Sequence, residues 1–237
     1  MSPFTSLHIP IDRAEEMDAA ELAPDRYARV LADLSRINAL TMASRPTLGF
    51  LDRVRTRGVG SKPWRVLDVG FGAGDMLARI AGWGDRRGVA LDLVGIDLNR
   101  KSEAVAAVRL GTRARLITGD YRNLAGQGWD LIMSSLVAHH MTAEERSQFL
   151  RFMEAEAGRG WLVNDLHRQR VPFAGYPLLA RLAGVDPIVR RDGQLSVGRS
   201  FRRPEWRAML DGALPGTARE CRIFRSFPYR LCVERIR

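Results

Sequence analysis

Short apolar runs alternate with helix-like segments along the middle of the chain, and this alternation predicts its architecture. Strand-like runs occur at 66–69, 93–97, 116–118, 129–133 and 161–163. Between them lie segments whose apolar residues recur every three or four positions, as in helices. Strands that alternate with helices form a parallel sheet with right-handed crossovers. Two more runs, 219–224 and 229–236, flank Ser226-Phe227-Pro228 and predict a terminal antiparallel hairpin. The pattern therefore predicts an α/β fold.

Two helices are expected before the first strand. Apolar residues recur at helical spacing from Asp25 to Leu40, behind Pro24, and again from about 46 to 57. The linker 58–63 leads into the first strand. We predict a helical cap over residues 1–60 and the main domain over 61–237, with an apolar insert at about 168–202. The polar, acidic stretch 1–23 is expected to be loose.

The stretch 66–75 carries the most specific signal in the chain. An apolar run that contains Asp68 is followed by Gly70, Gly72 and Gly74 and then by a helical pattern. Glycine allows positive φ and close approach of a ligand, and the helix N-terminus attracts an anionic group. The spacing is Gly-x-Gly-x-Gly rather than the dinucleotide form Gly-x-Gly-x-x-Gly. A carboxylate at Asp68 favours a cationic ligand over a pyrophosphate.

At these residues the sequence resembles the class I S-adenosylmethionine-dependent methyltransferases. The resemblance implies a Rossmann-like, doubly wound sheet of seven strands, mostly parallel, with an antiparallel strand from the C-terminal hairpin. A domain for another nucleotide is the alternative. The expected cofactor is S-adenosylmethionine, and the residues expected to bind it are Asp68, Gly70, Gly72, Gly74, Asp97, Leu98, Asp120, Tyr121 and Ser134.

Each of these residues has an expected role by resemblance. Asp68 and the glycines hold the methionine part, and Asp97 holds the ribose. Leu98 covers one adenine face, Asp120 accepts from the adenine amine, and Tyr121 lies beside the ring, with ordinary loop packing as its alternative. Because the carboxyl ends of parallel strands share one edge, Ser134 and Asn164 are expected beside them.

Three histidines are candidates for the base. Methyl transfer needs an aligned nucleophile, and a phenol must also lose its proton, which suits a histidine. His139 and His140 follow the fourth strand, and His167 follows the fifth. We expect at least one of them to contact the acceptor. The sequence does not separate the ring that faces the acceptor from the one that braces the loop.

The runs Ser134–Met141 and Asn164–Arg168 narrow the resemblance to methyltransferases of ubiquinone and menaquinone synthesis and to those encoded beside type III polyketide synthases. This implies a small phenolic, quinone-like or polyketide-lipid acceptor and O-methylation, with ring-carbon methylation left open. The insert could wall the acceptor pocket, or it could form a patch for a membrane surface or a dimer partner; the residues concerned are Phe173, Tyr176, Leu178 and Leu179. Phe71 departs from the small residue of many relatives and could crowd the cofactor or pack on the N-terminal helices.

Composition leaves two rival functions open. The net charge is +10, and the excess is nearly all arginine. A basic surface suits an anionic partner, so an RNA or DNA methyltransferase is one rival. The run Ser134–Val137 has neither the Asn/Asp-Pro-Pro-aromatic motif nor the Pro-Cys nucleophile of such enzymes, so no nucleic-acid partner is expected. A non-catalytic module that binds S-adenosylmethionine is the second rival.

Cysteine usage and the N-terminus complete the sequence-based expectations. Cys221 and Cys232 have no zinc-ligand spacing with histidine, so no metal is expected. Both are expected to be small buried residues of a reduced protein. Residues 1–10 lack the features of a signal peptide, and no apolar run approaches the ~20 residues of a membrane span. A cytoplasmic enzyme is expected.

Overall fold

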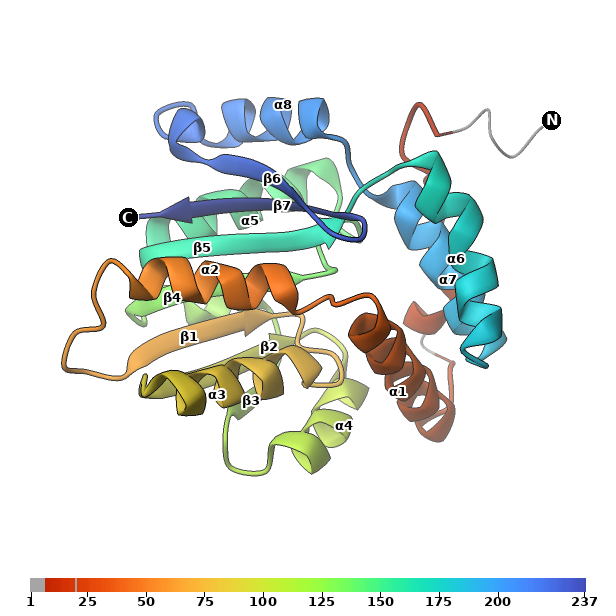
Figure 1. Cartoon of the computed structure of the whole chain (residues 1–237), viewed down its shortest axis with the longest axis horizontal. Helices are drawn as coiled ribbons and strands as arrows, with labels where there is room; N and C mark the ends of the chain where they lie inside the picture. The colour runs from red at the N-terminus through yellow and green to blue at the C-terminus, as the bar shows by residue number, and fades with distance from the viewer. Residues whose placement is uncertain (1–6, 20) are drawn as a thin grey trace.

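A seven-stranded sheet forms the centre of the computed structural model, which describes residues 7–19 and 21–237 (Figure 1). The strand order is β3-β2-β1-β4-β5-β7-β6. The first five strands are parallel, and β7 runs antiparallel to both of its neighbours. The strands are β1 Trp64–Val69, β2 Leu91–Asp97, β3 Arg115–Thr118, β4 Trp129–Ser135, β5 Ala157–Leu166, β6 Arg222–Ser226 and β7 Arg230–Ile236. The predicted fold class is confirmed.

Helices cover both faces of this sheet. Successive side chains of a strand point to opposite sides, so the apolar residues of each strand need a covering layer on both faces. In β1, Val66 packs in the core with α2 and α3, and Leu67 packs in the core with α5 and α8. The covering helices are α2 Arg45–Arg55, α3 Asp75–Arg87, α4 Arg100–Leu110, α5 Ala143–Glu156 and α8 Arg203–Ala213. A capping box formed by Thr142 and Glu145 begins α5.

Three further helices lie together at the end of the sheet to which β1 and β5 point (Figure 1). They are α1 Pro24–Leu40, α6 Arg170–Leu182 and α7 Pro187–Arg199. The apolar insert is thus two helices. The two N-terminal helices lie in different places: α1 lies at the edge of the sheet where the cavity opens, and α2 packs on a sheet face against β5 and β7.

The N-terminal segment is held against the rest of the protein, so the expectation that residues 1–23 are loose is wrong for Leu7–Asp18. Ile11 donates its backbone N–H to Gly198, and the backbone N–H groups of Glu16 and Met17 donate to the Asp192 carboxylate. Residues 1–6 and 20 lie outside the described part of the chain. These backbone bonds are formed with α7, which lies far away in the sequence.

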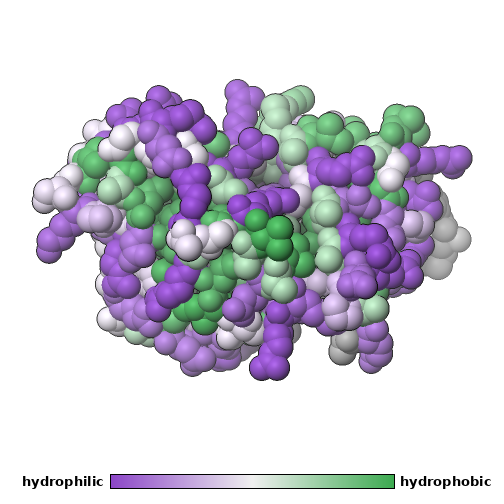
Figure 2. Space-filling model, turned by 90° about the horizontal axis from the view of Figure 1, so that it is seen from below, coloured by the Kyte–Doolittle hydropathy of each residue, from purple (hydrophilic) through white to green (hydrophobic). Residues whose placement is uncertain are grey.

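Surface hydropathy is mixed. On the face shown in Figure 2, hydrophobic residues are interleaved with hydrophilic ones among the described residues. Both cysteines are buried and unbridged. In the described part of the chain, we find no helix with the length and apolar character that a membrane span requires.

Candidate active site

A cavity of about 1010 Å³ opens at the carboxyl edge of the parallel strands. Its walls come from the glycine turn after β1, the ends of β2 and β4, α1, α6, α7 and the turn before β7. Pockets for one small molecule typically measure ~300–1,000 Å³. The cavity therefore has room for a nucleoside-sized cofactor and a second ligand.

The glycine turn has the conformation that its sequence predicts. Gly70, Gly72 and Gly74 have φ of 79°, 52° and 70°. A Cβ at Gly70 would lie 2.2 Å from Val137, and one at Gly74 would lie 2.8 Å from Leu110, so these two positions are required by packing. A Cβ at Gly72 would meet no atom within 4 Å, because this residue faces the cavity. A ligand can therefore contact the bare backbone there.

Asp68 places a buried carboxylate at the same end of the cavity. Its side chain is 1% exposed, and its Oδ2 has no hydrogen-bond partner. Burial, followed by the nearby charges of Asp75 and Asp97, raises the pKa of Asp68 to about 7. An unpaired buried carboxylate is costly unless a cation or a donor satisfies it. The site thus fits a ligand that brings positive charge, as the ammonium and sulfonium of S-adenosylmethionine do.

Asp97 ends β2 and faces the glycine turn. Its Oδ2 accepts the backbone N–H of Gly72 at 2.9 Å, and its Oδ1 accepts that of Asn99 at 2.8 Å. These bonds fix the carboxylate at the end of β2, beside the glycine turn. Leu98 is 79% exposed and lines the cavity beside it, where it can cover a flat ring.

Two predicted cofactor residues do not line the cavity. Both Asp120 oxygens accept from Arg122, which lowers the pKa of the carboxyl and turns it away from the adenine role. Ser134 is buried below the rim, and its neighbour Ser135 lines the cavity instead. Successive strand residues face opposite sides, so a one-residue difference decides this exposure. Tyr121 does line the cavity and packs against Phe149 and Phe152, each with a centroid distance of 4.9 Å.

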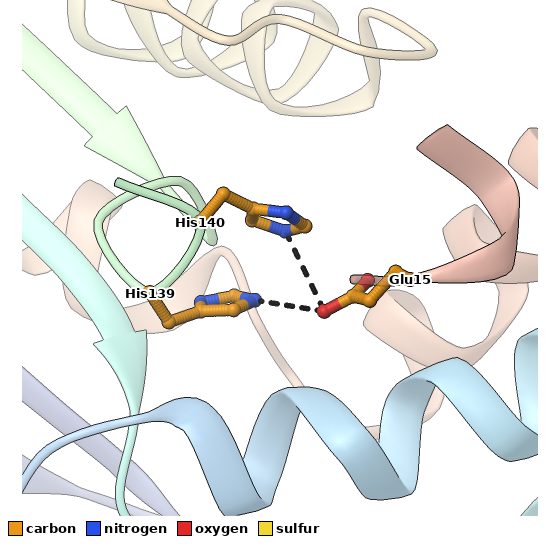
Figure 3. Close-up of side chains that lie close together, drawn as sticks. All are labelled: Glu15, His139 and His140. Atoms are coloured by element: carbon orange, nitrogen blue, oxygen red, sulfur yellow. Dashed lines mark ion pairs between the residues drawn. The ribbon is translucent and has the colours of Figure 1, made fainter. Parts of the chain in front are cut away.

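Glu15, His139 and His140 form a compact cluster on the cavity wall. Figure 3 shows the Glu15 carboxylate pointing between the two imidazole rings. Its Oε1 lies 3.7 Å from Nε2 of His139 and 3.8 Å from Nε2 of His140, and it accepts the Ser196 hydroxyl at 2.8 Å. His139 is buried, and the His140 side chain is 30% exposed. His140 is therefore the more accessible ring.

Opposite charges lie close together in this cluster, although Nε2 of His139 has no hydrogen-bond partner. Nδ1–H of His139 donates to Asp165 at 2.7 Å. Burial alone would lower the pKa of His139, but the Asp165 and Glu15 carboxylates outweigh it and raise the pKa to about 9. Burial would raise the pKa of Glu15, but the histidines and Ser196 lower it below its usual value. At neutral pH, His139 is thus a cation between two carboxylates and has no site left to accept a proton.

The third histidine candidate does not join the cluster. His167 bonds through its backbone N–H to Tyr229 and is not among the described residues that line the cavity. Burial, followed by the charges of three arginines, lowers its pKa to about 4. The expected convergence of three histidines is thus wrong for His167. Asn164 also turns away from the rim, because its Nδ2 donates to Ala43 and Thr47 in the α2 region.

The apolar insert contributes part of the far wall. Tyr176 and Leu179 of α6 line the cavity, and the Tyr176 hydroxyl donates to the Val189 carbonyl at 3.1 Å. Phe173 is buried between helices, and Leu178 is 61% exposed on the outer side of α6. Phe71 is also buried, with its ring against Gly95 under the turn, although it still borders the cavity.

Sequence reasoning missed Glu15, which is the central residue of the cluster. It belongs to an acidic stretch without helical or strand periodicity, so no local pattern marks it. Asp165 lies near the end of a predicted strand with nothing in the local sequence to mark it, and its contact with His139 depends on the fold. Two imidazoles and a carboxylate are also donors that transition metals accept, and these atoms lie within 4.8 Å of one another. The arrangement is thus chemically suited both to proton transfer and to metal binding.

Comparison with known proteins agrees with this geometry. Residues 66–155 match the family described as "Methyltransferase domain". No curated protein matches the sequence. The plantazolicin methyltransferase BamL, solved with a desmethylPZN analogue and SAH, is similar in fold with a TM-score of 0.63 at 16% identity, over 84% of this chain and 71% of that chain.

Two further solved structures have the same fold. The CMeT domain of the citrinin polyketide synthase gives a TM-score of 0.60 at 15% identity, over 81% of this chain; the match spans 52% of that chain. Magnesium protoporphyrin IX methyltransferase (ChlM) from Synechocystis PCC 6803, with bound SAH, gives 0.56 at 16% identity, over 92% of this chain and 90% of that one. Residues 66–155 therefore match a methyltransferase domain, and the chain has the fold of these solved structures, as its resemblance to the class I S-adenosylmethionine-dependent methyltransferases implies.

Proposed function

We propose that the protein transfers the methyl group of S-adenosylmethionine to a hydroxyl of a small phenolic, quinone-like or polyketide-lipid acceptor. The observation that carries this proposal is one continuous cavity with two chemically different ends. One end offers the unpaired Asp68 carboxylate beside an open glycine turn. The other end offers the Glu15, His139 and His140 cluster beside apolar side chains of α1 and α6.

The cofactor would be held by the edge of β1 and β2. The Asp68 carboxylate would bind the ammonium, Asp97 the ribose hydroxyls and Gly72 the methionine part, with Leu98 and Tyr121 at the adenine. When bound, S-adenosylmethionine supplies the electrophilic methyl group. Asp120 can serve the adenine amine only after Arg122 releases its carboxylate, so we place it behind Asp97 in importance.

The acceptor would be held at the cluster, with His140 as the base. Protonated His139 cannot take the acceptor's proton, and its link to Asp165 makes it the ring that braces the loop. His140 lines the cavity with its Nε2 near Glu15, so a proton taken there would be stabilised by the carboxylate. An acceptor hydroxyl next to His140 would be converted to the phenolate that attacks the methyl carbon.

Labelled S-adenosylmethionine should test this function directly. The protein is incubated with phenols, hydroxyquinones and alkylresorcinols and, in parallel, with RNA and DNA, and products are identified by mass analysis. We expect a methyl ether on a phenolic acceptor, with a rate unchanged by a chelator. Methyl incorporation into nucleic acid with salt-sensitive binding would favour the nucleic-acid rival. Cofactor binding without turnover of any acceptor would favour the non-catalytic module.

A further inference from the structure

Arg230 places a buried positive charge on the wall of the cavity that the proposed reaction does not use. It begins β7, pairs in register with Leu166 and Ser226, and is 3% exposed. Arginine is almost never fully buried unless it is paired. A buried, cavity-lining arginine is therefore a feature that needs a partner.

The protein does not supply that partner among its described residues. Nη1 of Arg230 has no hydrogen-bond partner, and its Nη2 reaches only the amide oxygen of Asn38, at 3.5 Å. No described carboxylate lies within ion-pair distance of it. Asp165 lies on the neighbouring strand β5, paired with Leu231, the residue after Arg230. Its carboxylate already accepts from His139 and from the backbone N–H of Leu166. Burial is the largest influence on Arg230 and lowers its pKa, and the charges of Asp165 and Asp75, which lie beyond ion-pair distance, only partly oppose it.

We infer that Arg230 binds an anionic group of the acceptor, of the carboxylate class. This rests on the proposed function and specifies its substrate. The guanidinium offers two parallel N–H groups that match a carboxylate, and a buried pair of this kind is stronger than a neutral hydrogen bond. An acceptor with an acid group would thus be held by its charge at Arg230, with its hydroxyl directed to the cluster.

A second source of a carboxylate is the methionine part of the cofactor, but position favours the acceptor. Asp68 lies on β1 and Arg230 on β7, and in the strand order β1-β4-β5-β7 these strands are three interstrand distances apart. At ~4.8 Å for each interstrand distance, the separation is roughly 14 Å. Arg230 donates to Asn38 of α1 and lies near Tyr176 of α6, on the wall that the insert contributes, and the charge of Asp75 at the start of α3 also acts on it.

A matched pair of probes tests the inference. With SAH bound, calorimetry compares 5-pentylresorcinol with 2,4-dihydroxy-6-pentylbenzoate, which adds only a carboxylate. The protein should bind the benzoate at least about tenfold more tightly, which corresponds to one charge-assisted contact. Arg230→Met should abolish this preference and leave SAH affinity within about twofold. Arg230→Lys, which keeps the charge, should retain part of the preference. Arg225→Met, an exposed arginine on the adjacent strand, should change neither.

The outcomes separate the two carboxylates. Equal binding of the two probes, or a preference that survives in Arg230→Met, overturns the inference. Weaker SAH binding in Arg230→Met with the probe preference intact also overturns it, because Arg230 would then bind the methionine carboxylate. Failure of the unmodified protein to bind SAH would instead contradict the proposed function, so the two failures are distinguishable.

Discussion

Asp68 and Glu15 are two of the buried carboxylates that line the cavity, and their pKa values shift in opposite directions. Asp68 lacks a partner for one oxygen, and its pKa rises to about 7. Glu15 faces two histidines and Ser196, and its pKa falls. Both are nearly inaccessible to water, so burial alone does not explain the difference. A buried charge without a partner in the protein indicates where a ligand of opposite charge binds. A buried charge that is paired within the protein indicates side chains whose positions are fixed before the ligand binds.

The largest expected effect comes from Asp68→Asn. The cofactor should bind about 100-fold more weakly, because a buried charge-assisted contact to its ammonium is lost. The unliganded variant should nevertheless melt at a higher temperature at pH 8, since a costly buried charge is removed. Calorimetry and thermal denaturation measure the two effects. Asp92→Asn, on an exposed strand carboxylate, is the control. A lower melting temperature with unchanged affinity would contradict the assignment.

His140→Ala should lower kcat about 100-fold and leave cofactor affinity unchanged, because general base catalysis is lost. His139→Ala should instead lower stability, since it leaves Asp165 and Glu15 buried without their cation. Steady-state rates on the acceptor found by the screen and thermal denaturation check this contrast. If both variants keep the full rate, the base lies elsewhere.

Glu15→Gln tests whether the Glu15 carboxylate stabilises the positive charge of His139 at the acceptor end. We expect it to lower the pKa of His139 from about 9 toward the ordinary value of 6.5 and to cost about 2 kcal/mol of stability, the size of one hydrogen bond to a charged group. NMR titration of the ring and denaturant unfolding give the two quantities. Glu16→Gln, in the exposed neighbouring pair with Arg191, is the matched control. A His139 pKa that does not move would separate Glu15 from the cluster.

Cofactor affinity should depend on pH in a defined direction. The folded pKa of Asp68, about 7, lies above its ordinary value of 3.8, so the unliganded protein binds this proton more tightly than the unfolded chain and loses stability as pH rises between the two values. A cationic cofactor prefers the ionised form. Affinity should therefore rise up to about tenfold per pH unit below 7 and level off above it. Calorimetry in Asp68→Asn should show no such rise.

The smallest effect is expected for Gly72→Ala. Its φ of 52° disfavours a side chain by about 1 kcal/mol, but no neighbour would be displaced. We expect this modest loss of stability together with weaker cofactor binding, because the methyl group would enter the cavity. Denaturant unfolding and calorimetry measure both. Gly88→Ala, at a φ of 64° in open space outside the cavity, should lose a similar amount of stability and leave affinity unchanged.

The cofactor end could be predicted largely from the sequence, because its determinants are local. A glycine turn, a strand and a helix start form one contiguous stretch, and Asp97 is the last residue of its own strand. The limits of the approach appear at Ser134 and Asp120. Ser134 faces away from the cavity because its strand presents Ser135 there, and Asp120 is bound by Arg122. The local sequence pattern shows neither of these arrangements.

The sequence by itself determined the order of strands and helices, the glycine turn and the acidic strand ends, since hydrophobic periodicity and backbone conformational preference act within a few residues. Only the tertiary structure decided which charges are compensated. It brings Glu15 from the N-terminal segment to His139 and His140, sets Asp165 behind His139 and turns His167 away. In the same cavity it leaves Nη1 of Arg230 and Oδ2 of Asp68 without hydrogen-bond partners. The reason is physical: the pKa of a buried group depends on desolvation and on charges within a few ångströms, whatever their distance along the chain.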